Sequence, residues 1–490
     1  MEEENHLIKD RIKKLEELRK LGIEPYEYRY EPTHRAKEIA EKYSTLAAEE
    51  KTKDKVRVAG RLITFRRMGK ATFANLQDFT GKIQLYFRED DIGKQYELLK
   101  LLDMGDIIGC EGIIFKTKTG EVTVYVEKFM LLTKSLRPLP EKWHGLKDEE
   151  LRHRQRYVDL IVNPEVREKF VMRSKVVEAM REFLIKDGFL EVETPTLQPI
   201  YGGGAAKPFV TQHHALKMSL YLRISDEMYL KRLIVGGFDK VFEICKDFRN
   251  EGIDTHHNPE FTMMETMSAY DNYEDSMKRT ERMFEFIAKK VLGTTEIEYL
   301  GRKLSLKAPF KRLKMADGVK KATGVDFLKL KDVEEARKVA RKFNVEIRED
   351  MGIGAIMAAI SSEVVEPKIV EPTFLMEYPK EVSPLSKPMK ANPEFVERFE
   401  ILICGMEFGN VYSEGNDPAV LRENWQHQEE LLKKGNEEAQ RTDEDFINAM
   451  EYGMPPTSGI GIGIDRLAML LTNTDSIRDV IFFPTLRERE

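Results

Sequence analysis

The segments Phe248-Arg-Asn-Glu-Gly252 and His256-His-Asn-Pro-Glu-Phe261 bring a permanent cation, several carboxylates and an aromatic ring into one short stretch of the chain. The guanidinium of Arg249 stays protonated, and its planar fork suits phosphate or carboxylate. Glu251 can accept hydrogen bonds, and Phe261 offers a flat face on which a base can stack. Apolar runs flank the stretch on both sides. The pattern predicts two adjacent strands joined by a charged loop that contacts a ligand.

Two further segments lie on either side of this loop in the sequence. Gly188-Phe-Leu-Glu-Val-Glu-Thr-Pro195 follows a predicted helix over residues 166–186, and Gly459-Ile-Gly-Ile-Gly-Ile-Asp-Arg466 is typical of a glycine-rich strand that turns into an apolar helix. Strand-like runs between them are unevenly spaced, which favours an antiparallel sheet flanked by helices over a doubly wound sheet. Residues 275–350 carry mainly helical patterns and are predicted to form a helical insertion.

The residues before these segments change period. Over residues 55–133, five short strand-like runs are punctuated by glycine, with one helical interruption near residues 92–102. This pattern is typical of a five-stranded barrel of the oligonucleotide-binding (OB) type. An amphipathic helix is predicted over residues 5–21. We therefore expect an α+β fold with four parts: a helical N-terminal extension (1–50), an OB barrel (51–136), a linker (137–150) and a larger domain (151–490).

The composition is that of a globular protein with a well-charged surface. The chain has 490 residues, of which 41% are apolar and 33% charged, and a formal net charge of −6. No apolar run reaches the ~18 residues of a membrane helix. No signal-peptide core is evident, and three widely spaced cysteines indicate neither disulfides nor a zinc site. We expect a cytoplasmic protein without membrane contact. A basic stretch at residues 51–70 fits either a phosphate-backbone contact or a solvated edge.

In their order, the three segments resemble motifs 1, 2 and 3 of the class II aminoacyl-tRNA synthetases. The match is best to the lysine-specific branch of bacterial type, which has an N-terminal anticodon-binding OB domain. The resemblance implies that ATP and lysine form lysyl-adenylate and pyrophosphate, and that lysine is then esterified to the 3′ end of its tRNA. Because lysine's own carboxylate is the first nucleophile, no Ser, Cys or His nucleophile is required. A homodimer is also implied, with Pro195 near its interface.

The resemblance assigns roles at the nucleotide. Arg249 bridges the lysine carboxylate and the α-phosphate, and Arg466 covers the nucleotide near the γ-phosphate; both are expected to be catalytic. Glu407 and Glu414 match the magnesium-binding acids of the family, and sparse carboxylates suit Mg²⁺ because phosphates and water supply its other ligands. The expected ATP-binding residues are Arg249, Glu251, His257, Asn258, Phe261, Glu407 and Arg466.

Lysine carries two ammonium groups, so a pocket that selects it needs acids. By resemblance, Glu227 faces the side-chain ammonium, and Tyr412 closes that part of the pocket. Two positions depart from the family pattern: Asp226 stands in Ser225-Asp226-Glu227 where many relatives have Ala-Pro-Glu, and Met267 stands where relatives commonly have Tyr. The residues expected around the α-amino end are Gly203, Glu265 and Asn410.

The barrel acquires a role from the same resemblance. Phe73 and Gln84 are expected to contact anticodon bases, with Arg66 close by. A base stacked on an aromatic ring contributes ~1–3 kcal/mol, while hydrogen bonds at base edges supply identity. Without the resemblance, ordinary barrel residues are the favoured interpretation of Phe73 and Gln84.

Three other functions are weighed against this one. An aspartate or asparagine ligase of the same architecture would need cations in the pocket where Glu227 stands. An enzyme that attaches lysine to a protein usually lacks the barrel. A catalytically inactive RNA-binding or signalling protein would have no need of the intact set Arg249, Glu251, Glu407, Glu414 and Arg466.

Overall fold

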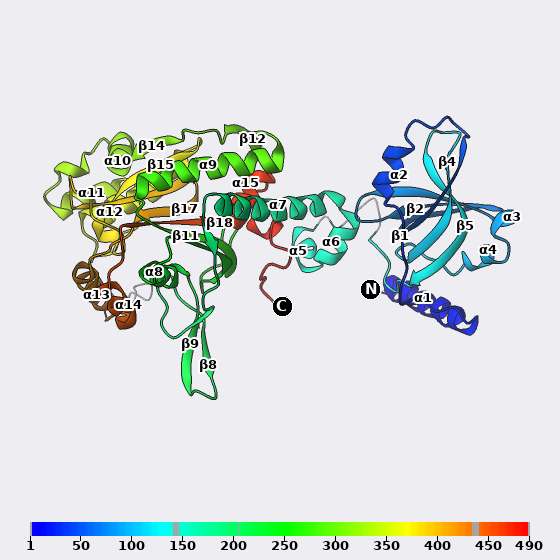
Figure 1. Cartoon of the computed structure of the whole chain (residues 1–490), viewed down its shortest axis with the longest axis horizontal. Helices are drawn as coiled ribbons and strands as arrows, with labels where there is room; N and C mark the ends of the chain where they lie inside the picture. The colour runs from blue at the N-terminus through cyan, green and yellow to red at the C-terminus, as the bar shows by residue number, and fades with distance from the viewer. Residues whose placement is uncertain (1, 141–145, 147, 205, 434–440, 489–490) are drawn as a thin grey trace. The chain divides into compact units, whose positions relative to one another are not determined.

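The computed structural model describes residues 2–140, 146, 148–204, 206–433 and 441–488. The chain divides into two compact units, Met1–Lys147 and Asp148–Glu490 (Figure 1). The predicted linker at residues 137–150 includes this boundary, and its residues 141–145 and 147 lie outside the described part. Among the described helices, none combines the length and the apolar character needed to cross a bilayer.

Five strands of the first unit close into the predicted OB barrel. Their order is β1-β2-β3-β5-β4, and neighbours are antiparallel except β3 and β5. Side chains alternate along β3, so Ile83, Leu85 and Phe87 fill the interior while Gln84 and Tyr86 lie on the outer face. The predicted helical interruption consists of α3 (Glu89–Ile92) and α4 (Gln95–Leu98). The strands are β1 (Lys51–Met68), β2 (Ala71–Gln77), β3 (Lys82–Arg88), β4 (Ile107–Lys116) and β5 (Val122–Thr133).

Two helices precede the barrel and pack on it. Helix α1 (Glu2–Lys20) confirms the amphipathic helix predicted at residues 5–21, and α2 (Ala36–Lys42) follows. Leu18 of α1 and Ile39 of α2 are buried in the same hydrophobic cluster as the barrel interior. The guanidinium of Arg11 donates to the carbonyl oxygens of Met104 at 2.9 Å and Ser135 at 3.1 Å. These bonds fix α1 to the barrel.

The second unit is built on an eight-stranded sheet with the order β14-β15-β16-β17-β18-β11-β10-β6. The sheet is mixed, which corrects the predicted antiparallel sheet: β14 pairs parallel with β15 and β6 pairs parallel with β10, one pair at each edge. Each parallel pair needs a long crossover, and the segments between those strands supply it. The strands are β6 (Leu190–Glu191), β10 (Lys240–Phe248), β11 (Glu260–Ala269), β14 (Lys311–Lys314), β15 (Thr373–Pro379), β16 (Phe395–Ile403), β17 (Met406–Ser413) and β18 (Thr457–Gly463).

Three helices pack their apolar faces on this sheet: α7 (Pro164–Lys186), α9 (Tyr273–Leu292) and α15 (Ile464–Leu471). Phe183, Phe284 and Leu467, one from each helix, are buried with Phe242 of β10 and Ile462 of β18. This cluster is the main core of the unit. It holds β10, β11, β17 and β18 side by side, so that their opposite face can carry a site (Figure 1).

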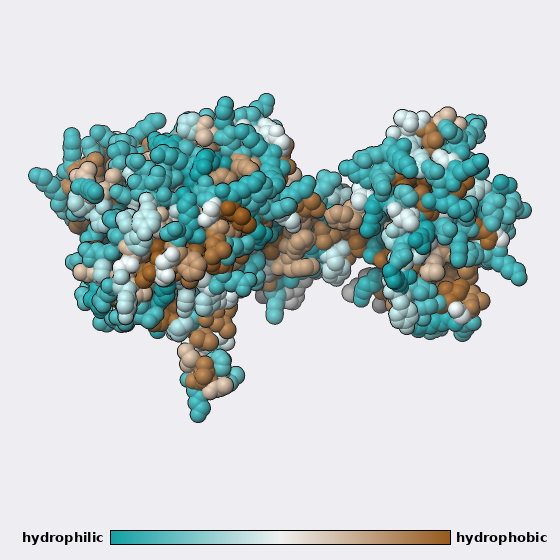
Figure 2. All heavy atoms as spheres, viewed as in Figure 1, coloured by the Kyte–Doolittle hydropathy of each residue, from teal (hydrophilic) through white to brown (hydrophobic). Residues whose placement is uncertain are grey.

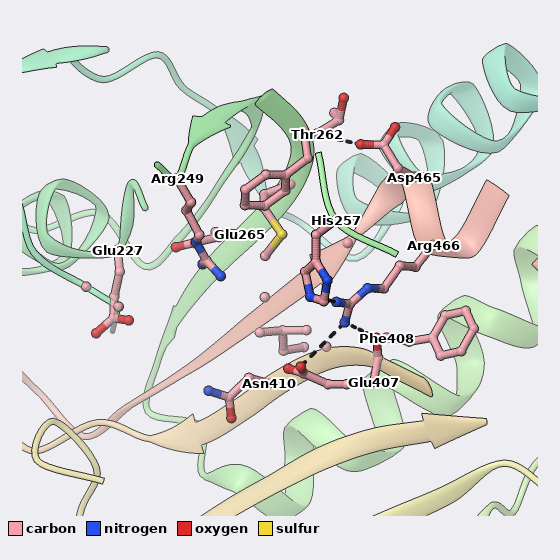
Figure 3. A pocket seen from close by; sticks show the side chains of 18 of the residues that line it. Glu227, Arg249, His257, Thr262, Glu265, Glu407, Phe408, Asn410, Asp465 and Arg466 are labelled. Carbon is pink, nitrogen blue, oxygen red and sulfur yellow. Dashed lines mark hydrogen bonds and ion pairs between the residues drawn. The ribbon is translucent and has the colours of Figure 1, made fainter. Parts of the chain in front are cut away.

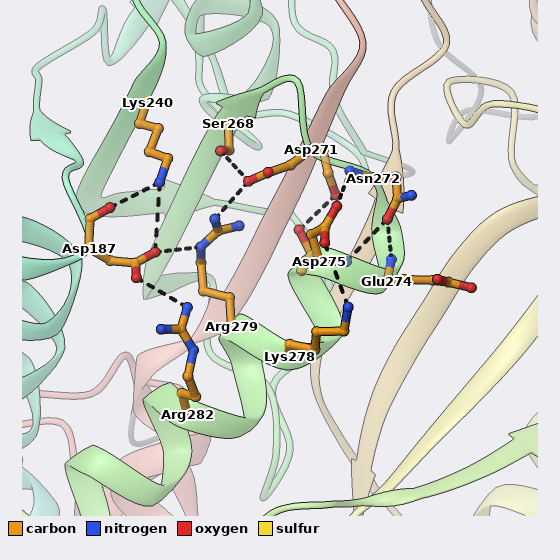
Figure 4. Close-up of polar contacts among 12 residues, drawn as sticks. Asp187, Lys240, Ser268, Asp271, Asn272, Glu274, Asp275, Lys278, Arg279 and Arg282 are labelled. Atoms are coloured by element: carbon orange, nitrogen blue, oxygen red, sulfur yellow. Dashed lines mark hydrogen bonds and ion pairs between the residues drawn. The ribbon is translucent and has the colours of Figure 1, made fainter.

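Charged side chains fix α9 to the end of α7 (Figure 4). Asp187 accepts a hydrogen bond from Arg279 at 2.8 Å, and Arg279 also donates to Asp271 at 2.7 Å. Burial raises the pKa of Asp187, but the hydrogen bond and charge of Arg279 outweigh burial and lower it below its ordinary value. Asn272 caps α9 by accepting from the backbone N–H groups of Glu274 and Asp275.

The predicted helical insertion at residues 275–350 is wrong in its bounds and content. Its first helix, α9, belongs to the main core, and strands β12 (Glu296–Tyr299), β13 (Arg302–Ser305) and β14 follow it. A separate hydrophobic cluster forms around α10 (Met315–Thr323), α11 (Val333–Lys342) and α12 (Ile353–Ile360), and it includes Leu375 of β15. The helical part therefore begins later and extends beyond residue 350. Helical periodicity alone does not separate an inserted helix from a core helix.

A small sheet and several helices complete the second unit. The three-stranded sheet has the order β7-β9-β8, and its β8–β9 hairpin projects from the unit (Figure 1). Apolar side chains gather on this hairpin (Figure 2), where Val210 is 59% and Leu216 64% exposed. The remaining elements are β7 (Leu197–Gln198), β8 (Val210–His213), β9 (Met218–Leu222), α5 (Glu149–Arg154), α6 (Arg156–Val162), α8 (Glu227–Val235), α13 (Pro418–Lys433) and α14 (Glu444–Glu451).

Candidate functional site

A cavity of about 300 Å³ opens over β10, β11, β17 and β18. Figure 3 shows that it has two ends: Arg466, His257 and Glu407 gather at one end and Glu227 lies at the other, with Arg249 and Glu265 between them. All thirteen residues predicted for the ATP, lysine and metal sites line it. They are Gly203, Glu227, Arg249, Glu251, His257, Asn258, Phe261, Glu265, Glu407, Asn410, Tyr412, Glu414 and Arg466.

The charged loop between β10 and β11 is held by its own hydrogen bonds. The N–H of Arg249 donates to the carbonyl of Pro259 at 2.9 Å, and the side chain of Asn258 donates to the carbonyl of Glu260 at 2.6 Å. The guanidinium of Arg249 lies 5.0 Å from the centre of the Phe261 ring. The predicted hairpin is therefore confirmed, and its cation and ring are already in contact.

Arg466 closes the same end of the cavity from helix α15. Its guanidinium donates to the carbonyl of Glu407 at 2.6 Å and lies 3.2 Å from Nε2 of His257 (Figure 3). His257 is held in turn by Asp254, whose carboxylate lies 2.8 Å from Nδ1. Arg249 follows the end of β10 and Arg466 lies on α15, so two arginines reach the cavity from different elements, an arrangement that suits a polyanion between them.

Asp465, which sequence reasoning missed, fixes Arg466 relative to β11. One carboxylate oxygen accepts from the backbone N–H of Thr262 at 2.6 Å, and the other accepts from Arg173 of α7 at 2.6 Å. Asp465 is buried at the start of α15, where a negative charge is favourable. The signal was present in the sequence, because an acid follows a run of apolar residues and glycines and directly precedes Arg466.

The other end of the cavity is acidic, and the buried side chain of Lys231 partly neutralises it. The Nζ of Lys231 lies 2.5 Å from Glu227 and 2.5 Å from Glu414, and the hydroxyl of Tyr412 donates to Glu227. Burial lowers the pKa of Lys231, but the two carboxylates outweigh burial and raise it. Sequence reasoning missed Lys231 because a lysine within an apolar helix is normally a surface residue. Glu227 therefore already has a cation and a hydroxyl as partners.

Glu414 is the less satisfied of these two acids. Its side chain is fully buried, and within the described part neither oxygen accepts a hydrogen bond of good geometry, although Lys231 is close. Burial raises its pKa to about 8; Lys231 lowers the pKa and the Glu227 charge raises it. Gly459 lies against Glu414 and Met267. A Cβ at this position would come within 2.8 Å of the Met267 side chain and would also press on the Glu414 carboxylate, so a larger residue would displace both side chains. Glu414 thus offers a buried acceptor for a further cation.

Glu407 and Glu414 lie at opposite ends of β17. Both carboxylates line the cavity, and the assignment of magnesium to Glu407 and Glu414 stays a prediction. Glu400 lies on the adjacent strand β16, opposite Asn410, and burial and then the Glu407 charge raise the pKa of Glu400 to about 7. Glu400 also accepts from Arg398 at 2.6 Å. Glu407 is therefore the cavity-lining carboxylate at the arginine end that could hold a cation.

The predicted anticodon residues share one outer face of the barrel. Arg66 pairs in register with Phe73, and Phe73 with Tyr86, whose ring centre is 4.8 Å away. The side chain of Gln84 donates to Glu121 at 2.6 Å. Sequence reasoning missed that Tyr86 belongs to a group of half-exposed aromatic rings on this face. The rings are Phe73, Tyr86, Phe115 and Tyr125, with neighbouring centres 4.8–5.7 Å apart.

Two family descriptions match the chain. "tRNA synthetases class II (D, K and N)" covers residues 148–487, and "OB-fold nucleic acid binding domain" covers residues 56–132. A lysine–tRNA ligase of Carboxydothermus hydrogenoformans is 55% identical over 490 residues, which cover 100% of this chain and 99% of the relative. One of Bacillus subtilis is 50% identical over 491 residues, covering 100% of this chain and 98% of the relative. The chain belongs to the class II lysine–tRNA ligase family.

Family membership confirms the fold class expected from the three motifs: an OB barrel followed by a class II catalytic unit. The structure adds contacts that the motifs did not give: Lys231 buried between two acids, the Asp465 link to β11 and the group of rings beside Phe73. Each includes at least one contact between residues on different helices or strands.

Proposed function

We propose that this cavity joins lysine to ATP as lysyl-adenylate and that the chain then esterifies lysine to the 3′ end of lysine tRNA. One observation carries the proposal: a single cavity has Arg466 at one end, the buried acids Glu227 and Glu414 at the other, and Arg249 between them. Such a cavity complements a polyphosphate at one end and a dicationic amino acid at the other. The relatives named lysine–tRNA ligase support the same reaction.

At the nucleotide end, positioning and charge would supply catalysis. Arg249 would neutralise both the lysine carboxylate and the α-phosphate, which otherwise repel each other, and align them for attack. Arg466 would bind the outer phosphates, with Asp465 holding its helix in place. Glu251, His257, Asn258 and Phe261 would bind the adenosine part. Charge that develops on the α-phosphate would meet donors that are already in place before the reaction.

At the acidic end, two carboxylates would receive the two ammonium groups of lysine. Glu265, with Gly203 and Asn410 nearby, would hold the α-amino end, and Ser225 already donates to Glu265 at 2.9 Å. Glu414 would receive the side-chain ammonium, while Lys231 and Tyr412 keep Glu227 occupied. This assignment moves the main selective acid from Glu227 to Glu414.

We propose that Mg²⁺ binds with ATP at Glu407, as the resemblance implies. The site fits, because Glu407 is an oxygen donor that lines the cavity beside Arg466, and its side chain is 41% exposed. Hard carboxylate ligands supplemented by phosphates and water suit Mg²⁺. The ion would withdraw charge from the phosphates.

We propose that the barrel face of Arg66, Phe73 and Gln84 binds the anticodon of lysine tRNA. Half-exposed rings beside a basic strand suit stacked bases and a phosphate backbone.

We further propose a homodimer in the cytoplasm, where tRNA and ATP are found. Leu190 and Leu197, which flank Pro195, are 51% and 46% exposed, and a second copy would bury them. A solution mass of one chain would contradict the dimer.

Two assays test the reaction. ATP–pyrophosphate exchange, run separately with each amino acid, should depend on lysine alone; exchange with aspartate or asparagine, or none at all, would refute the proposal. Charging of lysine tRNA then separates this function from attachment of lysine to a protein. The control is Arg249→Ala, which should abolish exchange while leaving the folded structure intact.

A further inference from the structure

A second cluster of acids lies behind the lysine end of the cavity. Asp226, Asp247 and Glu265 each place one carboxylate oxygen within 4.8 Å of the other two. All three side chains are buried; Asp226 and Asp247 have no exposed surface. Only Glu265 also lines the cavity. The cluster is therefore a closed group of carboxylates with one side toward the substrate pocket.

Asp226 has no protein partner for its charge. Within the described part of the chain, neither of its oxygens accepts a hydrogen bond, and Oδ2 of Asp247 accepts none. Asp226 directly precedes α8, yet its side chain does not cap that helix. Buried polar atoms are normally satisfied, and a buried charge is tolerated only when it is paired or bound to a metal.

The cations around the cluster are too few for its acids. Two cations act on the cluster. Burial raises the pKa of Asp247 and outweighs Arg249 and Arg223, which both lower it. Arg223, 3.6 Å from Asp247, also binds Glu243 at 2.7 Å, so its charge is shared. Among the residues the structure describes, neither Asp226 nor Glu265 forms an ion pair. Burial and neighbouring carboxylates raise the pKa of Asp226 well above its ordinary value and that of Glu265 to about 8. Either protons or an added cation must balance this charge.

We propose that Asp226, Asp247 and Glu265 bind one hard divalent cation of the Mn²⁺ or Mg²⁺ class beneath the lysine pocket. Carboxylate ligands suit these ions. Oxygens within 4.8 Å of one another can all reach a single ion at about 2.0–2.6 Å. The ion enters through the cavity that Glu265 lines and displaces the protons that otherwise occupy the carboxyl groups. It neutralises the cluster and fixes Glu265 in position.

Binding of Mn²⁺ alone tests this site without lysine, ATP or tRNA, so its result is independent of the proposed reaction. Full-length protein is freed of metal with a chelator and titrated with Mn²⁺ at pH 7.5, and free Mn²⁺ is followed by electron paramagnetic resonance. We expect one ion per chain. Asp226→Asn and Asp247→Asn should each weaken it at least tenfold. The matched control is Glu407→Gln, which removes an acid at the other end of the cavity and should leave this ion bound.

Thermal unfolding distinguishes a variant that has lost the metal site from one that is misfolded. Without metal, Asp226→Asn should be at least as stable as the wild type, because it removes a buried and unpaired carboxylate while keeping its shape. Mn²⁺ should then raise the Tm of the wild type but not of Asp226→Asn. The proposal is overturned if no Mn²⁺ binds, if Asp226→Asn retains the Tm gain, or if Glu407→Gln alone abolishes binding.

Discussion

At the scale of single residues, the proposed selection of lysine follows from how the acids of the pocket are already paired. Glu227 holds Lys231 and Tyr412, whereas Glu414 is buried and has only Lys231 close by. Lysine binding would bring an ammonium to Glu414 and displace the proton that this carboxyl holds in the free protein, and removing one partner of such a buried ion pair typically costs about 3–5 kcal/mol. We therefore expect Glu414→Gln to raise KM for lysine in pyrophosphate exchange by about a hundredfold or more, with KM for ATP changed less than about threefold.

Glu407→Gln is the matched opposite of that variant, because it removes one carboxylate of the same strand at the arginine end. It should raise KM for ATP and the Mg²⁺ concentration needed for half-maximal exchange, and leave KM for lysine nearly unchanged. Equal effects of the two variants on lysine would argue against the assignment of Glu414 to the side-chain ammonium.

The pKa of Glu414 also gives a pH dependence with a definite sign. Burial raises this pKa to about 8 in the folded protein, against 4.5 ordinarily. Between those values the folded state holds a proton that the unfolded chain has released, so the free energy of unfolding falls as pH rises from about 5 to about 8. The slope contributed by one such group reaches about 1.4 kcal/mol per pH unit. Urea unfolding at pH 5.5–8.5 should show a smaller slope for Glu414→Gln than for the wild type; equal slopes would mean that Glu414 is ionised throughout.

At the scale of elements, Asp465 joins β18 and α15 to β11 and α7. Asp465→Asn keeps an acceptor for the N–H of Thr262 but loses the charge that pairs with Arg173. We expect a loss of about 1–3 kcal/mol in the free energy of unfolding and a lower kcat for exchange, because Arg466 is no longer held. The control is Asp475→Asn, an exposed acid nearby, which should change stability by less than about 0.5 kcal/mol. An Asp465→Asn protein with unchanged stability and kcat would contradict the positioning role.

The elements also show where sequence reasoning stops. Motif residues such as Arg249 and Arg466 could be found from the chain because each lies in a short pattern that carries its own chemistry. The parallel strand pairs at the two edges of the sheet could not be predicted from the sequence, because strand direction depends on the crossover connections and not on local periodicity. The helical insertion was misplaced for a similar reason: α9 and α11 have the same period, and only packing assigns α9 to the main core. Lys231 was hidden because its partner Glu414 is 183 positions away.

At the scale of the whole molecule, the chain separates its two recognition tasks into two units. The candidate lysine and ATP residues all belong to Asp148–Glu490, and the candidate anticodon residues all belong to Met1–Lys147. Each unit has its own hydrophobic cluster. A change on the outer face of the barrel should therefore leave adenylate formation intact and affect only the step that needs tRNA.

Phe73→Ala tests that separation. Phe73 is half-exposed and contacts Tyr86 at 4.8 Å on the outer face, so its loss leaves the barrel interior filled. Loss of one base-stacking contact costs ~1–3 kcal/mol of binding free energy. KM for lysine tRNA should therefore rise about 5- to 150-fold, while the rate of lysine-dependent pyrophosphate exchange stays within about twofold. Tyr28→Ala is the control, because Tyr28 is a 95% exposed aromatic residue of the same unit that lies outside this group of rings. A parallel loss of exchange and charging in Phe73→Ala would show that the barrel face acts on the catalytic unit and not on the anticodon.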